Sequence, residues 1–247
     1  MKNTDHLQTI VTHPYQRLQV ELEAIISNTH AGEKLLTEPK LSRQLGVSRS
    51  TLREAMRAFE AQGRIRRQQG IGTFVVDKSQ VIDAGLEKLE SIESIARRIN
   101  LPVSMGRLLT EHVMADKILA ESMLIEQGQP LLKLSRIIHV EQRPVAYLID
   151  ILLEGLISAD DLKLGFTGSI LDLLMKSDQA QPEKSFTEIQ AVAAPSAIAH
   201  ALQIQRGDVL LQFSANLYSK PGQIVDHSES YFLPGYFRFH VVRTVGV

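Results

Sequence analysis

The chain contains at residues 34–76 the stretch KLLTEPKLSRQLGVSRSTLREAMRAFEAQGRIRRQQGIGTFVV, whose capping and glycine residues predict two helices followed by a hairpin. Thr37 is a typical N-cap residue, and the helical turn that follows it tolerates Pro39. Gly46 ends this short helix, and Ser48 is placed to cap the next one. The apolar residues of the next helix recur at i, i+3, i+4 and i+7 and so form one inward face: Leu52, Ala55, Met56 and Phe59.

The flanking segments complete this unit. Upstream, apolar residues at helical spacing predict an amphipathic helix over about residues 14–29. Downstream, two short strands are expected within residues 64–76, because Gly70 and Gly72 permit the positive φ values of a tight turn. Three helices followed directly by a hairpin are typical of a winged helix-turn-helix, which we expect over residues 10–76.

Charge is divided unevenly along the chain, whose net charge is −1. Residues 1–78 carry 12 Lys+Arg against 8 Asp+Glu, whereas residues 79–247 carry 15 against 20. Within residues 40–68, eight basic side chains stand against two acidic ones. A basic head on an acidic body is the distribution expected when only one domain contacts phosphate.

The segment SRSTLR, residues 48–53, carries the side chains best placed to read DNA. In a helix-turn-helix the second helix enters the major groove N-terminus first, so base-reading residues belong in its first two turns. We therefore assign DNA contacts to five residues of this helix start: Ser48, Arg49, Ser50, Thr51 and Arg53. The alternative is a solvated charged face for the helix and an ordinary charged hairpin for residues 66–74.

The second part of the chain contains an internal repeat. LAESMLIEQGQPLLKLSR, residues 119–136, aligns without gaps to IAHALQIQRGDVLLQFSA, residues 198–215, at a spacing of 79 residues. Each copy predicts a short helix, a glycine turn and a strand, and the continued register relates Asp150 to Glu229. Two copies are too few for a solenoid, so we expect one α+β domain over residues 95–247 with pseudo-twofold symmetry and an antiparallel sheet.

The segment between these two parts is charge-rich and mostly helical in pattern. We interpret residues 79–99 as linker plus helix, with the linker itself over residues 77–94.

Composition excludes several classes of protein. The content of 44% hydrophobic and 22% charged residues is that of a globular protein. Cysteine is absent, which excludes disulfides, thiolate metal sites and a cysteine nucleophile. The N-terminus lacks a signal-peptide core, and no apolar run approaches the roughly 18 residues of a membrane span. We expect a cytoplasmic protein with no membrane segment, no metal and no cofactor.

Residues 34–76 resemble the winged helix-turn-helix of the GntR family of bacterial regulators. The shared residues are a serine-arginine pair with the threonine and arginine that follow it, and a glycine-any-glycine-threonine-phenylalanine wing: Ser48, Arg49, Thr51, Arg53, Gly70, Gly72, Thr73 and Phe74. The resemblance adds Gly70, Gly72 and Thr73 to the expected DNA contacts. Members commonly begin the second helix with serine-glutamate-arginine, but this chain has proline at the arginine position, residue 39. Lys40 is expected to substitute as a point charge.

Residues 95–247 resemble the UTRA effector domain of the HutC subfamily. The resemblance implies a chorismate-lyase-like α+β fold, a homodimer, and a pocket whose small-molecule effector alters DNA affinity. Arg136 matches the first arginine of the subfamily's arginine-any-arginine strand, but the second position is Ile138. Ser169 matches the serine before a helix that flanks the sheet, with Leu171 in place of a tyrosine.

The late strand supplies further expected effector contacts. Glu229 matches the acidic residue of that strand, and His227 and Tyr231 share its face by strand alternation. Asp150 joins them, because acids on apolar strands are seldom buried without a partner or ligand. We expect a less polar or singly anionic effector, such as a carboxylate, held by Arg136. One alternative is that Arg136 forms a structural ion pair with Asp150. The others are that His227 is a histidine whose hydrogen bonds are satisfied within the protein, and that Tyr231 is a core aromatic residue.

The sequence thus predicts a homodimeric repressor that binds double-stranded operator DNA of pseudopalindromic sequence and releases it when a metabolite fills the pocket. Activation in place of repression stays open. One alternative is an enzyme, a lyase fused to a DNA-binding head, although the chain presents no convincing nucleophile, metal cluster or acid–base pair. Another is an architectural DNA-binding protein whose body takes no effector.

Overall fold

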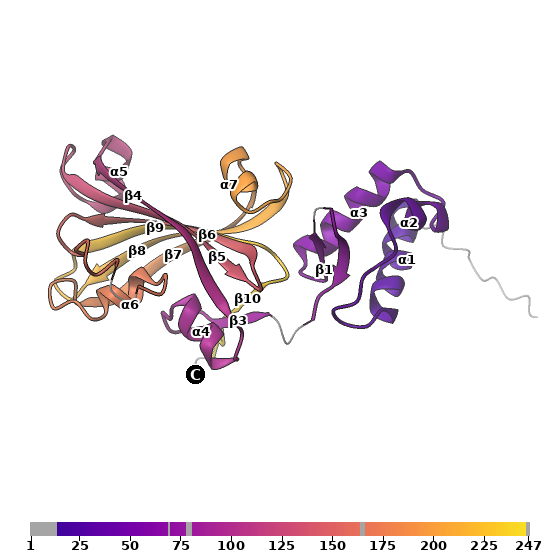
Figure 1. Ribbon diagram of the computed structural model, residues 1–247, viewed down its shortest axis with the longest axis horizontal. Coiled ribbons are helices and arrows are strands. Elements are labelled where there is room, and N and C mark those ends of the chain that lie inside the picture. The colour runs from indigo at the N-terminus through magenta and orange to yellow at the C-terminus, as the bar shows by residue number, and fades with distance from the viewer. Residues whose placement is uncertain (1–13, 69, 78–80, 164–165, 246–247) are drawn as a thin grey trace, which may run out of the picture. The chain divides into compact units, whose positions relative to one another are not determined.

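The computed structural model describes residues 14–68, 70–77, 81–163 and 166–245. The chain divides into two compact units, residues 1–77 and 78–247 (Figure 1). None of the described helices is long and apolar enough to cross a membrane.

The first unit is the predicted winged helix-turn-helix, although residues 10–13 of the expected range lie outside the described residues. Its elements are α1 (Pro14–Asn28), α2 (Glu38–Gln44), α3 (Arg49–Ala61), β1 (Ile65–Gln68) and β2 (Gly72–Val75). β1 and β2 pair antiparallel, with Ile65 opposite Val75. A bridge between Lys34 and Phe74 attaches the segment before α2 to the hairpin.

Local capping explains where these helices begin. The side chain of Ser48 accepts a hydrogen bond from the backbone N–H of Thr51 at 3.1 Å, which satisfies one free donor at the start of α3. Thr37 occupies the N-cap position of α2 as predicted, but its side chain makes no capping bond. The three helices then bury one apolar core, in which Leu22, Leu41 and Leu52 are fully buried.

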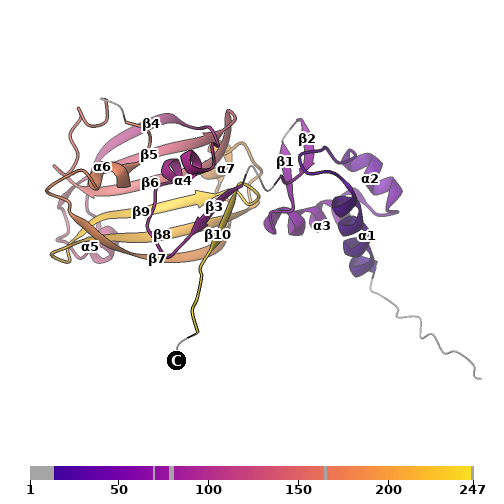
Figure 2. The same cartoon turned by 90° about the horizontal axis from the view of Figure 1, so that it is seen from below.

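The second unit is built on one antiparallel sheet of six strands in the order β4-β5-β6-β9-β8-β7 (Figure 2). These strands are β4 (Val103–Met114), β5 (Pro130–Val140), β6 (Arg143–Leu153), β7 (Pro182–Ala193), β8 (Val209–Ser219) and β9 (Ile224–Phe232). The two sequence copies form β4 to β6 and β7 to β9, and they meet at the pairing of β6 with β9. The predicted α+β domain with an antiparallel sheet is therefore confirmed.

The predicted relation of Asp150 to Glu229 is wrong by one residue. In the first copy, Asp150 lies opposite Leu134 in the sheet. The residue equivalent to Leu134 in the second copy, 79 positions later, is Phe213, and Phe213 lies opposite Ser230. The counterpart of Asp150 is therefore Ser230. The cause is the hairpin turn, which has two residues between β5 and β6 but three between Ser219 and Gln223. Because side chains alternate along a strand, the extra residue moves Glu229 to the face opposite Asp150.

Different elements cover the two faces of the sheet. α5 (Lys117–Met123) and α7 (Ser196–Ala201) lie on one face, and α4 (Ile92–Arg98) and α6 (Ile170–Leu174) lie on the other (Figures 1 and 2). A parallel pair of short strands, β3 (Ile82–Gly85) and β10 (Phe237–His240), accompanies α4.

The predicted linker over residues 77–94 needs correction. Residues 82–85 are strand β3, because they pair with β10 near the end of the chain. The helix in this region is also shorter than its apolar pattern indicated, since α4 begins after the Ser91 N-cap. Most of the expected linker is thus part of the second unit.

Candidate functional site

The start of α3 presents the polar residues expected to contact DNA. Arg49, Ser50, Thr51 and Arg53 are all exposed, as is the capping residue Ser48. The three hydroxyls form one cluster, because the Ser48 Oγ lies 2.7 Å from the Ser50 Oγ and 2.8 Å from the Thr51 Oγ1. Lys40 on α2 is exposed as well. The structure therefore places these predicted contacts on the accessible surface of the first unit.

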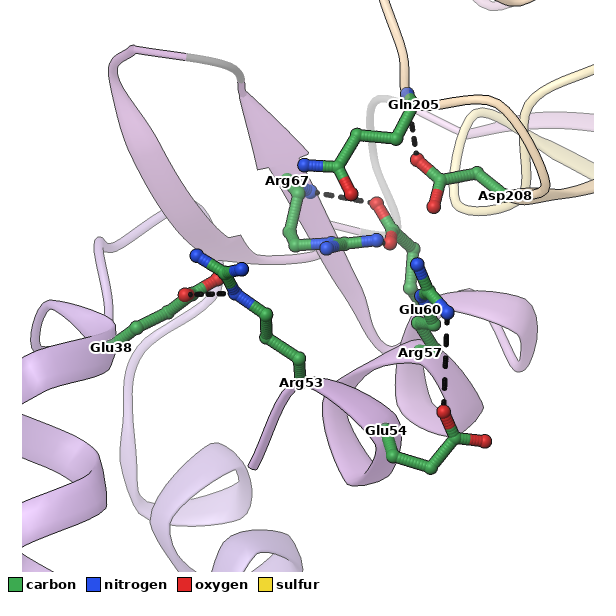
Figure 3. A network of polar contacts seen from close by, with 8 residues as sticks. All are labelled: Glu38, Arg53, Glu54, Arg57, Glu60, Arg67, Gln205 and Asp208. Atoms are coloured by element: carbon green, nitrogen blue, oxygen red, sulfur yellow. Dashed lines mark hydrogen bonds and ion pairs between the residues drawn. The ribbon is translucent and has the colours of Figure 1, made fainter. Parts of the chain in front are cut away.

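Arg53 is held by an acid from the neighbouring helix. Its Nε donates to the Glu38 Oε2 at 2.7 Å, a contact that ties α3 to α2 (Figure 3). The Arg53 side chain is still 54% exposed. An exposed ion pair of this kind contributes only about 0.2–1 kcal/mol to stability, so a phosphate or base can compete for the arginine.

Two other arginines near this surface, Arg57 and Arg67, are paired within the first unit. The Arg67 Nε lies 2.7 Å from the Glu60 Oε2, and Arg57 lies 3.9 Å from Glu54 (Figure 3). Arg49 makes no ion pair among the described residues. Of the predicted DNA readers on α3, Arg49 is thus the arginine whose charge no acid of the described residues neutralises.

The wing residues differ from one another in exposure. Gly70 is exposed and has a φ of 74°, in the left-handed region that glycine adopts readily. Thr73 is buried, with 7% of its surface exposed, and its carbonyl accepts the backbone N–H of Leu35 at 2.8 Å. Gly72 is half-buried beside the Lys34 side chain. Thr73 therefore stabilises the wing through its backbone, and its side chain is not exposed for a contact with DNA.

The second unit contains a cavity of about 590 Å³ between the sheet and the layer of α4, α6 and β3. Three of the residues expected to contact the effector line it: Arg136, Asp150 and Ser169. Its apolar wall includes Leu148 and Phe213. The volume lies within the roughly 300–1,000 Å³ that is typical of small-molecule sites.

Arg136 forms a buried ion pair with Asp150, the alternative that the sequence left open. Nη1 of the guanidinium donates to the Asp150 Oδ2, and Nε donates to the backbone carbonyl of Gly168. Arg136 is 4% exposed and Asp150 is 7% exposed. Gly168 has a φ of 109°, and a Cβ at this position would lie 2.8 Å from the Glu93 Oε1. A larger residue would disturb the loop that holds the arginine.

Ser169 follows this loop and begins α6. Its Oγ accepts the backbone N–H of Asp172 at 2.9 Å, so the predicted ligand residue is also a helix cap. Ser91 caps α4 in the same manner and donates to the Asp172 Oδ2 at 3.0 Å. The two short helices over the cavity are thus joined to each other.

Two further acids line the cavity that were not among the predicted site residues. Glu93 on α4 is 7% exposed, and Asp226 on β9 is 6% exposed. Burial raises the pKa of both carboxyl groups, and the nearby charge of Asp150 raises each further. Asp226 is an acid on a strand with buried apolar neighbours, as Asp150 is, so the same sequence signal was present at this position. Glu93 gave no such signal, because an acid in the first turn of a helix is ordinarily solvated.

The other three predicted effector residues lie on the opposite face of the sheet. Tyr231 and Glu229 both contact the side-chain amide of Gln212, which donates to each. The His227 Nδ1 lies 2.7 Å from the Asn216 Oδ1. Strand alternation therefore grouped His227, Glu229 and Tyr231 correctly, but the cavity formed by Arg136 and Asp150 does not include them.

Comparison with known proteins agrees with this division of the chain. Residues 14–75 match the model described as bacterial regulatory proteins, gntR family, and residues 103–238 match that of the UTRA domain. The histidine utilization repressor of Klebsiella aerogenes is 27% identical over 223 residues, which are 86% of this chain and 88% of the relative. The HTH-type transcriptional repressor NagR of Bacillus subtilis is 24% identical over 226 residues, which are 88% of this chain and 89% of the relative.

A solved structure supports the same fold. PhnF from Mycobacterium smegmatis superposes with a TM-score of 0.62 at 18% identity, over 93% of this chain and 100% of that chain. The relatives are regulators of transcription and not enzymes. The chain therefore belongs to the GntR family of bacterial regulatory proteins, in its HutC subfamily, and joins a DNA-binding winged helix-turn-helix to a UTRA domain that takes a small-molecule effector.

Proposed function

We propose that the chain is a homodimeric repressor that binds a pseudopalindromic operator through α3 and the wing, and that an effector in the cavity of the second unit releases it. The observation that carries the proposal is the start of α3, where Arg49 is exposed without an ion pair among the described residues beside the hydroxyls of Ser50 and Thr51. Such a surface offers a planar donor to a guanine edge and short donors to phosphate. As a regulator of bacterial genes, it would act in the cytoplasm.

Repression and dimerisation are inferred from different grounds. Both relatives described above are named repressors, which supports repression rather than activation. A helix-turn-helix commonly binds as a dimer, with two recognition helices about one turn of DNA apart, because two half-sites multiply the information that one helix reads. The expected operator therefore has two inverted half-sites.

The effector acts through a difference in affinity. A ligand shifts the equilibrium between the DNA-binding and released conformations only if it binds one of them more tightly. The cavity is lined by residues of α4, α6 and the sheet, so its occupancy can move short helices that hydrogen bonds already couple. The expected anionic effector loses support, because Arg136 is already bonded to Asp150.

Selection from a random DNA library with the full chain tests the proposal. We expect enrichment of one sequence with inverted half-sites, and a complex of two chains with one operator duplex by sedimentation. Arg49→Ala should enrich that sequence much more weakly, while Glu121→Gln, which changes an exposed residue of α5, should enrich it as strongly as the unaltered chain does. Enrichment of no sequence by the unaltered chain would contradict the proposal.

A further inference from the structure

The cavity of the second unit contains more buried acid than its arginine can neutralise. Glu93, Asp150, Asp226 and Arg136 all line it, and each is at most 7% exposed. The ion pair accounts for Arg136 and Asp150. Two carboxyl groups remain, from two different elements of the fold.

Each remaining carboxyl group has one oxygen that no donor satisfies. The Glu93 Oε1 and the Asp226 Oδ1 are buried and have no hydrogen-bond partner among the described residues. A buried acceptor without a donor is unfavourable, and native structures pair the great majority of such atoms. Two such acceptors lie in residues that line one cavity, where a ligand with hydrogen-bond donors would satisfy them.

Burial opposes ionisation of these acids. Burial is the main cause that raises the pKa of Asp226, and the charge of Asp150 adds to it, while Arg136 and the backbone N–H of Ile151 act in the other direction. Burial also raises the pKa of Glu93; its own backbone N–H and Arg136 lower it, and Asp172 and Asp150 raise it. The cavity therefore shifts the pKa of both acids upward, and a further positive charge inside it would act in the opposite direction.

The remainder of the wall fits an apolar body. Leu148, Ile170, Phe213 and Phe232 line the same cavity, and the rings of Phe213 and Phe232 meet edge to face with centroids 5.1 Å apart. An aromatic or aliphatic group would pack against this wall while a polar head reaches the acids.

We propose that the cavity takes a ligand with a positively charged nitrogen, an ammonium or amidinium group, on an apolar or aromatic body, and that the unpartnered oxygens of Glu93 and Asp226 accept its N–H donors. The proposal rests on the proposed function, because it gives the chemical class of the effector for the same cavity. A carboxylate ligand has no comparable buried partner there, since it would have to displace Asp150 from Arg136, and the other cations of the lining, Lys88 and Lys184, are exposed.

Direct binding to three ligands with one skeleton tests this selection. The probes are 2-phenylethylamine, the neutral 2-phenylethanol and the anionic 3-phenylpropionate, each titrated by calorimetry into the full chain. We expect the amine to bind at least tenfold more tightly than either analogue. Benzamidine against benzyl alcohol and benzoate repeats the comparison for an amidinium group. Equal binding within each set, tighter binding of the anions, or no binding of either cation up to about 10 mM would overturn the proposal.

Variants that remove only the negative charge connect this preference to the two acids. Glu93→Gln and Asp226→Asn resemble the protonated side chains, so both should fold with an unchanged or higher melting temperature. Each should reduce the preference for the amine over the alcohol at least fivefold. Asp178→Asn, an exposed residue after α6, is the matched control and should keep the preference. Full retention of the preference in both cavity variants would overturn the assignment.

Proton release gives an independent readout. A cation stabilises the ionised acids, so binding of the amine should release protons and become tighter as pH rises, up to the pKa of the amine. Other charged side chains at the cavity are Glu87, Lys88, Glu90, Glu183 and Lys184. None of these has an unpartnered buried oxygen, so Glu90→Gln should not change the number of protons released. Calorimetry in buffers of different ionisation heat measures this number, and zero protons would contradict the proposal.

The proposed ligand class and the proposed function can fail independently of each other. Operator binding without any ligand is measured on the same protein preparation. If the chain binds its operator but prefers the carboxylates, the effector class is wrong and the regulator stands. If it binds the amine but selects no DNA sequence, the proposed function fails while the specificity of the cavity stands.

Discussion

Arg136 on β5 and Asp150 on β6 form a buried ion pair across neighbouring strands, although neither is the direct partner of the other in the sheet register. Arg136 lies opposite Leu148 and Asp150 lies opposite Leu134, so the pair is diagonal. A buried charge whose partner is removed is strongly unfavourable, whereas replacing both charges together with apolar groups is often tolerated.

Arg136→Ala should therefore lower the free energy of unfolding by about 3–5 kcal/mol, because it leaves Asp150 buried without its cation. The double variant Arg136→Met, Asp150→Leu should recover most of this loss. Chemical unfolding followed by circular dichroism measures both. An Arg136→Ala variant of unchanged stability would mean that the arginine serves ligands rather than the fold.

The pKa of Asp226 predicts how stability changes with pH. Burial raises this pKa in the folded chain above its ordinary value of 3.8, so the folded chain binds the proton more tightly than the unfolded chain. The stabilising contribution is fully present below the unfolded pKa and is lost as pH rises through the folded pKa. Asp226→Asn removes it, so the difference in unfolding free energy between Asp226→Asn and the unaltered chain should grow with pH. Parallel stability profiles between pH 4 and pH 8 would contradict this.

Two variants distinguish a contact between Arg53 and DNA from the effect of its ion pair with Glu38. Arg53→Ala should weaken operator binding by about 1–3 kcal/mol if the arginine contacts DNA. Glu38→Gln breaks the same ion pair but keeps the arginine, so it should change stability by less than about 1 kcal/mol and leave operator affinity intact or higher. Fluorescence anisotropy with labelled operator measures affinity at fixed salt. Equal losses from the two substitutions would show that the pair acts by holding α2 to α3.

The opposite face of the sheet offers a test of which residues belong to the ligand site. Glu229→Gln and Tyr231→Phe alter the network around Gln212 and not the cavity. Both should therefore bind 2-phenylethylamine as the unaltered chain does. A tenfold loss of amine affinity in either variant would place the ligand on that face.

Short-range signals made the first unit predictable. The signals that predicted its helices act within one or two helical turns: the Ser48 cap, Gly46, and the spacing of apolar residues from Leu52 to Phe59. The structure has the helices where these signals predicted them. The wing glycines act equally locally. Thr73 was the exception, since its burial depends on the segment around Leu35, which pairs with the hairpin from a distance in sequence.

Long-range pairing limited the prediction of the second unit. β3 has four residues, and its partner β10 lies about 155 residues further on, so no local pattern distinguished it from a linker. The repeat gave the sheet but misplaced Asp150 relative to Glu229, because one extra turn residue shifts every later side chain to the other face. Glu93 was missed since only the tertiary fold buries it.

Arg49 decides whether the start of α3 reads operator DNA. The measurement is the affinity of the full chain and of Arg49→Ala for the selected operator, and for a random duplex of equal length, at one salt concentration. We expect Arg49→Ala to weaken operator binding by about 1–3 kcal/mol, roughly 5- to 150-fold, with little effect on the random duplex and an unchanged melting temperature. Equal affinity of both proteins for the operator would contradict it.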